Sequence, residues 1–181
     1  TLWENVVGKK MYLTGGIGAR HHDEAFGANY ELPNSSAYNE TCAAIGNAMW
    51  NHRMFLLHGE SKYIDVLERV LYNGFLAGIS IDGDEFFYPN PLASDSTYKF
   101  NKGSTARQGW FACSCCPVNI VRFIPAIAGY MYAKRDDDIY VNLFVPGEGT
   151  IDLDGDRIRL EQQTRYPWDG NVHIAVDPEK P

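Results

Sequence analysis

Apolar side chains recur at helical spacing in three stretches of the chain: residues 38–58, 62–78 and 117–134. Such a period of three to four residues is typical of helices that bury one face. The short polar turn at residues 59–61 predicts that the first two helices form a hairpin. The three apolar stripes contain Cys42, Ile45, Met49 and Leu56 in the first stretch, Ile64, Leu67, Leu71 and Phe75 in the second, and Ile120, Ile124, Ile127 and Met131 in the third.

Prolines punctuate the third stretch. Pro117 suits a first helical position, where its missing N–H costs nothing, and Pro125 predicts a kink. A helix that begins there has Cys115 and Cys116 at its N-terminus. The positive end of the helix dipole at that place stabilises a thiolate.

Two irregular segments separate or precede these helices. Thr14-Gly15-Gly16-Ile17-Gly18 resembles a phosphate-binding loop but lacks its Lys-Ser/Thr pair, which favours a tight turn instead. Residues 93–109 are polar and too long for a simple connection. That length indicates a functional or surface excursion.

After Asp136-Asp137-Asp138 the apolar period changes to alternation. Residues 139–145, 150–153, 157–166 and 172–176 read as successive antiparallel strands, with a turn predicted at residues 146–149. The expected fold class is therefore mainly α with a β tail. The expected domains are residues 1–135 and 136–181. Because the chain begins at Thr1 and ends within a predicted β domain, we expect a fragment of a longer protein.

Composition and charge restrict the partners. The 181 residues are 45% apolar, and 16 basic against 23 acidic side chains give a net charge of −7. A nucleic-acid or anionic-membrane partner needs a basic face, so we expect neither. No apolar run approaches the ~20 residues of a membrane span. The composition is that of a globular protein.

The cysteines are clustered in a way that favours a metal over disulfides. Cys113, Cys115 and Cys116 fall together, and Cys42 is their one distant partner. Glu40, Cys42, Cys115 and Cys116 make a plausible set of three sulfurs and one carboxylate, for which zinc is the first candidate. Metal-bound thiols imply a reducing compartment, so we expect a cytoplasmic location. We expect Cys113 to be a buried packing residue rather than a ligand.

Helix geometry restricts where Glu40 can lie if it shares an ion with Cys42. Residues i and i+2 point about 200° apart on a helix, so Glu40 and Cys42 can share one ion only if Glu40 lies at the helix cap or in its first turn. The alternative is that Glu40 merely caps the helix. Two other functions stay open: a structural zinc site in a helical binding module, and a thiol redox protein, against which the missing Cys-x-x-Cys spacing argues.

Three motifs together resemble a known family. Tyr38-Asn39-Glu40-Thr41-Cys42, Tyr88-Pro89-Asn90-Pro91-Leu92 and the segment from Cys113 to Asn119 resemble the β-L-arabinofuranosidases of glycoside hydrolase family 127. The resemblance runs from about residue 10 to residue 150. It implies the C-terminal part of an (α/α)6 barrel followed by the first strands of a β-sandwich. It implies a carbohydrate substrate, with the rest of the barrel as a partner of this chain and a homo-oligomer as an open alternative.

The resemblance also implies roles for single residues. Zinc would be held by Glu40, Cys42, Cys115 and Cys116, and Cys115 would be the nucleophile of a retaining glycoside hydrolase. Glu24 would be the general acid/base, a role for which its own spacing gives no argument. Tyr88 would face the sugar. The sugar-binding histidines of the family lie on earlier barrel helices, outside this chain.

Overall fold

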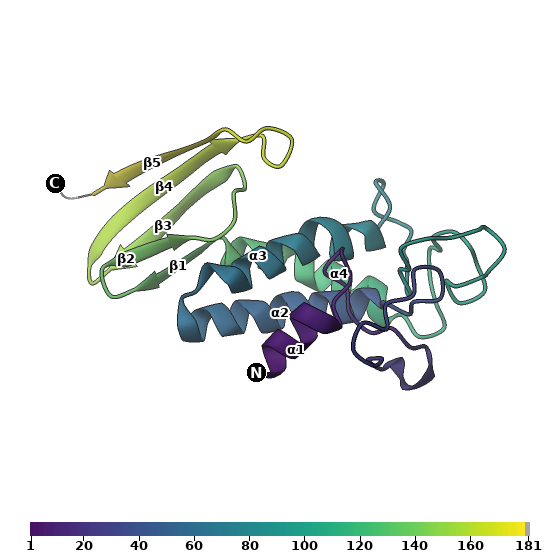
Figure 1. The fold of residues 1–181 in the computed structure, drawn as a ribbon. Helices are drawn as coiled ribbons and strands as arrows, with labels where there is room; N and C mark the ends of the chain where they lie inside the picture. The colour runs from purple at the N-terminus through teal and green to yellow at the C-terminus, as the bar shows by residue number, and fades with distance from the viewer. Residues whose placement is uncertain (180–181) are drawn as a thin grey trace. The chain divides into compact units, whose positions relative to one another are not determined.

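The structure, a computed structural model, describes residues 1–179 and divides into two compact units, Thr1–Pro125 and Ala126–Pro181. Helices dominate the first unit and strands the second (Figure 1). The expectation of helices followed by antiparallel strands is thereby confirmed.

The first unit is built on a helical hairpin and a later helix. Its α-helices are α1 (Leu2–Lys9), α2 (Thr41–His58), α3 (Ser61–Arg69) and α4 (Cys115–Ala126), and η1 (His22–Glu24) is a short 3₁₀ turn. Helix α3 continues through the π-helical η2 (Val70–Phe75) and the 3₁₀ turn η3 (Leu76–Gly78), so the predicted second stretch is helical throughout. Gly59 ends α2 in the left-handed conformation, at φ 69°, which turns the chain into the hairpin. In the described chain, no helix is long and apolar enough to cross a bilayer.

The core of this unit lies between α2, the α3–η2 segment and α4. Ile45, Leu67, Phe75 and Ile120 are fully buried there. The rings of Phe75 and Phe123 meet edge to face, with their centroids 5.1 Å apart. Aromatic pairs in this arrangement add to the free energy that their burial contributes. The stripe predicted for the second stretch is confirmed in full.

Two of the predicted core positions are wrong. Leu56 on α2 is 60% exposed, and Ile124 on α4 is 44% exposed. Each follows an aromatic residue, Phe55 or Phe123, that takes the inward direction. Because neighbouring helical residues point about 100° apart, the residue after an inward ring is turned toward the outside.

The predicted third helix is too long. Helix α4 ends at Ala126, η4 (Ile127–Tyr130) follows, and Tyr132–Arg135 is already a strand. Pro125 has no N–H to donate and its ring crowds the preceding turn, so it ends the helix instead of only kinking it. The helix also begins at Cys115, two residues before the predicted first position. Pro117 then falls in the first turn, where a missing N–H still costs nothing.

The second unit consists of two small antiparallel sheets. Strands β1 (Tyr132–Arg135) and β2 (Asp138–Val141) form a hairpin, and β3 (Gly147–Leu153), β4 (Asp156–Thr164) and β5 (Val172–Pro178) pair in that order. Residues 147–149, predicted as a turn, belong to β3. Gln162 is buried and donates to Tyr132 OH at 2.9 Å and to the Leu143 carbonyl at 3.1 Å. This amide fastens β4 to the hairpin.

The glycine-rich segment before α2 is a tight turn, as predicted. Gly15 has φ +86°, and a Cβ at Gly16 would lie 2.0 Å from Oδ1 of Asn39. Buried Asn47 on α2 donates to the Gly15 carbonyl at 2.9 Å. The turn therefore supports the backbone that leads into α2, and its glycines permit the close approach.

Candidate functional site

Two helix N-termini bring the predicted ligand residues together. Glu40 and Cys42 stand at the start of α2, and Cys115 and Cys116 open α4. One ligand atom from each of these residues lies within 4.8 Å of all the others. The two neighbouring sulfurs, of Cys115 and Cys116, are 3.9 Å apart. We call this group the thiol cluster; it could hold a metal ion.

Glu40 satisfies the condition that the helix geometry imposes. It is the N-cap residue of α2, with extended backbone at φ −62° and ψ 139°, and its side chain makes no capping hydrogen bond. Its Oε1 lies 3.5 Å from Cys115 Sγ and 3.3 Å from Cys116 Sγ. The carboxylate thus faces the sulfurs and does not cap α2 through a side-chain hydrogen bond.

The pKa values of the thiols reflect their crowding. Burial raises the pKa of Cys115 to about 12, and its neighbours Cys42 and Glu40 act in the same direction. The hydrogen bond between Cys116 and Cys42 raises the pKa of the Cys116 thiol and lowers that of the Cys42 thiol. A cation between these groups would favour the thiolates, since it cancels the repulsion among them.

Tyr88 lies directly beside the thiol cluster. Its hydroxyl oxygen is 2.9 Å from Cys115 Sγ, and the side chain is buried. The backbone is fixed on both sides, because the Thr41 N–H donates to the Tyr88 carbonyl at 3.0 Å and the Tyr88 N–H donates to Asn101 Oδ1 at 2.8 Å. Tyr88 is thereby tied to the first turn of α2, on which Glu40 and Cys42 stand.

Glu24 lies in an exposed loop with unusual backbone. Asp23 and Glu24 both have positive φ, at 57° and 50°. The loop is closed by a bidentate ion pair in which Arg20 donates to both oxygens of Glu31, each at 2.7 Å. Tyr38 OH donates to Glu24 Oε1 at 2.6 Å. Tyr38 precedes Glu40 of the thiol cluster by two residues, so this bond links the loop to the start of α2.

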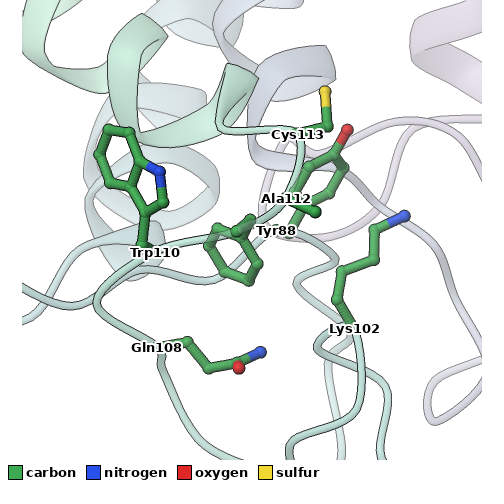
Figure 2. Close-up of a pocket in the computed structure, with 7 residues that line it drawn as sticks. Tyr88, Lys102, Gln108, Trp110, Ala112 and Cys113 are labelled. Carbon is green, nitrogen blue, oxygen red and sulfur yellow. The ribbon is translucent and has the colours of Figure 1, made fainter.

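A cavity of about 340 Å³ opens beside Tyr88. Figure 2 shows Lys102 reaching up alongside the Tyr88 ring, with Trp110 across the cavity. The Lys102 ammonium lies 4.3 Å from the centroid of that ring and donates to Tyr38 OH at 3.1 Å. Trp110 is 63% exposed. Aromatic faces and single polar groups in such a cavity are typical of small-ligand sites.

The expectation that Cys113 is a buried packing residue is wrong. Cys113 is exposed and lines this cavity, instead of packing in the core. The reason is that α4 begins only at Cys115, so Cys113 belongs to the irregular segment before the helix and has no inward helical face. Within residues 1–179 it is not part of the thiol cluster.

The periodicity of apolar residues does not identify the side chains that connect the Glu24 loop to the thiol cluster. Tyr38 lies in the motif at residues 38–42, where the pattern indicates only the start of a helical stretch. Lys102 and Asn101 lie in the polar stretch 93–109, whose length was the one signal of a functional segment. Nothing in the spacing of these three residues indicates that they meet.

Comparisons with known proteins agree with these motifs. A family model for the GH127 beta-L-arabinofuranosidase catalytic domain matches residues 1–129, and one for the middle domain of the same family matches residues 138–181. The non-reducing end beta-L-arabinofuranosidase of Bifidobacterium longum subsp. longum is 37% identical over 180 residues, which are 96% of this chain and 27% of that protein.

Solved structures give the same result. A GH127 beta-arabinofuranosidase superposes with a TM-score of 0.90 at 55% identity, over 96% of this chain and 26% of that one. A GH127 beta-L-arabinofuranosidase from Geobacillus stearothermophilus T6 gives a TM-score of 0.91 at 42% identity, over 98% and 28%. The chain spans about a quarter of the length of these relatives. It belongs to the β-L-arabinofuranosidases of glycoside hydrolase family 127.

Proposed function

We propose that this chain carries the catalytic centre of a retaining glycoside hydrolase that releases β-L-arabinofuranose or a related sugar. Cys115 is the nucleophile and Glu24 is the general acid/base. The observation that carries the proposal is the thiol cluster itself, with Cys115 Sγ beside both the Glu40 carboxylate and Tyr88 OH. The substrate follows from what the related proteins are named for.

Zinc is the proposed metal of the thiol cluster. Four Zn ligands at ~2.3 Å for sulfur and ~2.0 Å for oxygen would stand about 3.5–3.8 Å from one another in a tetrahedron. The separations of 3.3 to 3.9 Å around Cys116 and Glu40 agree with this geometry. When bound, the metal would keep the sulfur of Cys115 deprotonated at neutral pH.

The reaction divides into two displacements. In the first, the Cys115 thiolate attacks the anomeric carbon, the bond to the leaving oxygen breaks, and Glu24 gives that oxygen its proton. In the second, water attacks the same carbon, the carbon–sulfur bond breaks, and Glu24 takes a proton from the water. Two inversions give net retention, with a thiolate in the place where most retaining glycosidases use a carboxylate. Tyr88, next to the sulfur, is placed to contact the sugar.

The remaining parts of the proposal rest on family membership. The first unit would be the last part of an (α/α)6 barrel, and the strands would begin a β-sandwich, with the boundary near residue 135. The earlier barrel helices would complete the sugar subsite and would be the chain's closest partners. A homo-oligomer is compatible with this assignment.

The test compares Cys115→Ser with the unchanged full-length protein. We expect hydrolysis of an aryl β-L-arabinofuranoside to fall by at least ~1,000-fold, because a serine hydroxyl in this position is not ionised. Metal content is measured on the same samples. If metal is retained and turnover is unchanged, Cys115 is not the nucleophile and the thiol cluster is a structural site.

A further inference from the structure

Two hydrogen bonds of determined direction join three polar side chains, those of Lys102, Tyr38 and Glu24. Lys102 Nζ is 3.1 Å from Tyr38 OH, and Tyr38 OH is 2.6 Å from Glu24 Oε1. An ammonium can only donate, so the Tyr38 oxygen accepts from Lys102. The hydroxyl proton of Tyr38 is then directed at the carboxyl group of Glu24.

We propose that Lys102 and Tyr38 are positioning residues that orient the acid/base carboxyl of Glu24 for proton transfer. This inference rests on the proposed function. The Tyr38 bond engages Oε1 of Glu24, so the proton that moves to the leaving oxygen is carried on Oε2. Lys102 acts through Tyr38 and does not itself touch the reacting atoms.

The backbone conformation at Lys102 is unusual and is enforced by surrounding hydrogen bonds. Lys102 has φ 51°, a conformation that side-chain-bearing residues rarely adopt, although a glycine stands next to it in the chain. The turn is held by two backbone hydrogen bonds between Asn101 and Ser104, at 2.9 and 3.2 Å. Asn101 is fully buried and donates to the Phe86 and Ala106 carbonyls. Strain that the surroundings enforce in this way is a pointer to function.

The Lys102 ammonium also contacts Tyr88, whose hydroxyl lies beside the proposed nucleophile Cys115. It lies 4.3 Å from the ring centroid of Tyr88 and 5.1 Å from that of Tyr38, and the two rings are 6.4 Å apart. A cation over two aromatic faces resists displacement, because both rings attract it. Lys102 thus fixes Tyr38 relative to Tyr88, whose hydroxyl stands beside Cys115.

Leaving groups of different acidity separate positioning from a general structural effect. The full-length protein carrying Lys102→Met or Tyr38→Phe is assayed on aryl β-L-arabinofuranosides whose phenols range from dinitrophenol to unsubstituted phenol. General acid catalysis contributes ~10²–10⁴-fold to the rate where the leaving group needs a proton. We therefore expect kcat/KM for the phenyl glycoside to fall ~10- to 100-fold and for the dinitrophenyl glycoside less than ~3-fold.

The double variant tests whether Lys102 acts through Tyr38. If it does, Lys102→Met combined with Tyr38→Phe is no slower than Tyr38→Phe alone, within ~2-fold. Independent effects that multiply overturn the proposal. So does an equal loss for all leaving groups, which would assign Lys102 to sugar binding or to folding, and so does no loss at all.

Controls distinguish this inference from the proposed function. Lys99→Met and Tyr30→Phe change exposed residues of the same kinds and are expected to leave every rate unchanged. In Glu24→Gln the loss of kcat/KM must be much larger for the phenyl than for the dinitrophenyl glycoside. If it is not, Glu24 is not the general acid/base. If Glu24→Gln shows it and Lys102→Met does not, only the present inference fails. Metal content and Tm are measured for each variant, and Lys102→Gln replaces Lys102→Met if the latter does not fold.

Discussion

The thiol cluster and the Glu24 loop are held in place by opposite means. The cluster stands on the first turns of α2 and α4, and Cys116 is fully buried. The Glu24 loop contains only a short 3₁₀ turn and a β-bridge between Arg20 and Ala25, and an exposed ion pair joins Arg20 to Glu31. One half of the site is fixed by the core, and the other by a few surface bonds.

This difference matches the roles proposed for the thiol cluster and for Glu24. Metal ligands need fixed separations, and helix ends packed on a core provide them. Catalytic residues often lie on loops that a rigid scaffold positions, and the Glu24 loop is such a segment in the proposed function. Tyr38 and Lys102 then have a particular importance, because they connect the Glu24 carboxyl to the Tyr88 ring beside the thiol cluster.

Apart from the loss of Cys115, the loss of a buried member of the thiol cluster should have the largest effect. Cys116→Ser replaces a sulfur 3.3 Å from Glu40 with a weaker ligand in a fully buried position. We expect bound metal to fall to a small fraction of one per chain and activity to fall by more than ~100-fold. Elemental analysis and hydrolysis assays of the full-length protein measure both.

Cys113→Ser is the matched control for that change. Cys113 is exposed and, within residues 1–179, lies outside the thiol cluster, so metal content should stay unchanged. Equal metal loss in both variants would contradict the ligand assignment. Metal loss in neither would show that Cys116 is not a ligand.

Removing the buried amide of Asn101 should have the next largest effect. Asn101→Ala removes the bonds of the Tyr88 N–H and the Ala106 carbonyl to this amide. The Phe86 carbonyl loses one of its two donors and keeps the Gln108 N–H. We expect the free energy of unfolding to fall by about 2–4 kcal/mol, since unpaired buried polar groups are costly. Chemical denaturation measures it. The control is Asn73→Ala, at an exposed site with one bond to the Arg69 carbonyl, which should change the free energy of unfolding by less than about 0.5 kcal/mol. Comparable losses in the two variants would contradict the role of Asn101 in holding the Tyr88 backbone.

The thiol cluster could be predicted from the sequence because a short local motif marks each of its two halves. Adjacent cysteines, a Glu two residues before a Cys, and a helix start at each place restrict the geometry, and Glu40 is found at the N-cap, as that restriction required. The stripe of the second helical stretch was equally accessible, since burial there follows the helical period. The end of α4 was not, because a proline such as Pro125 is compatible with either a kink or the end of a helix.

The Glu24 loop could not be predicted in this way. Its conformation depends on positive φ at Asp23 and Glu24 and on a bond from Tyr38, which periodicity does not encode. Lys102 meets Tyr38 across a separation of 64 residues. Only the resemblance to a family identified Glu24, and even the resemblance gave no reason for its orientation.

The surface pair that closes the Glu24 loop should have the smallest effect, visible in its dependence on pH. Hydrogen bonds from Arg20 and from the Ala28 N–H hold the pKa of Glu31 at about 2, below its ordinary 4.5. Arg20→Met should therefore lower Tm by no more than ~2 °C at pH 7, because exposed pairs contribute little. Thermal unfolding of both proteins from pH 7 to pH 3 measures the difference.

The sign of that dependence follows from the depressed pKa. Above pH 4.5 Glu31 is ionised in both the folded and the unfolded chain, so the contribution of the pair is complete and the Tm difference is constant. As the pH falls from 4.5 toward 2, the unfolded chain binds the proton first, and the difference shrinks. Protonation of groups outside the Arg20–Glu31 pair acts on both proteins alike and cancels in the comparison. A difference that grows in acid, or one that Arg53→Met reproduces at another exposed arginine, would mean that the Arg20–Glu31 pair does not close the loop.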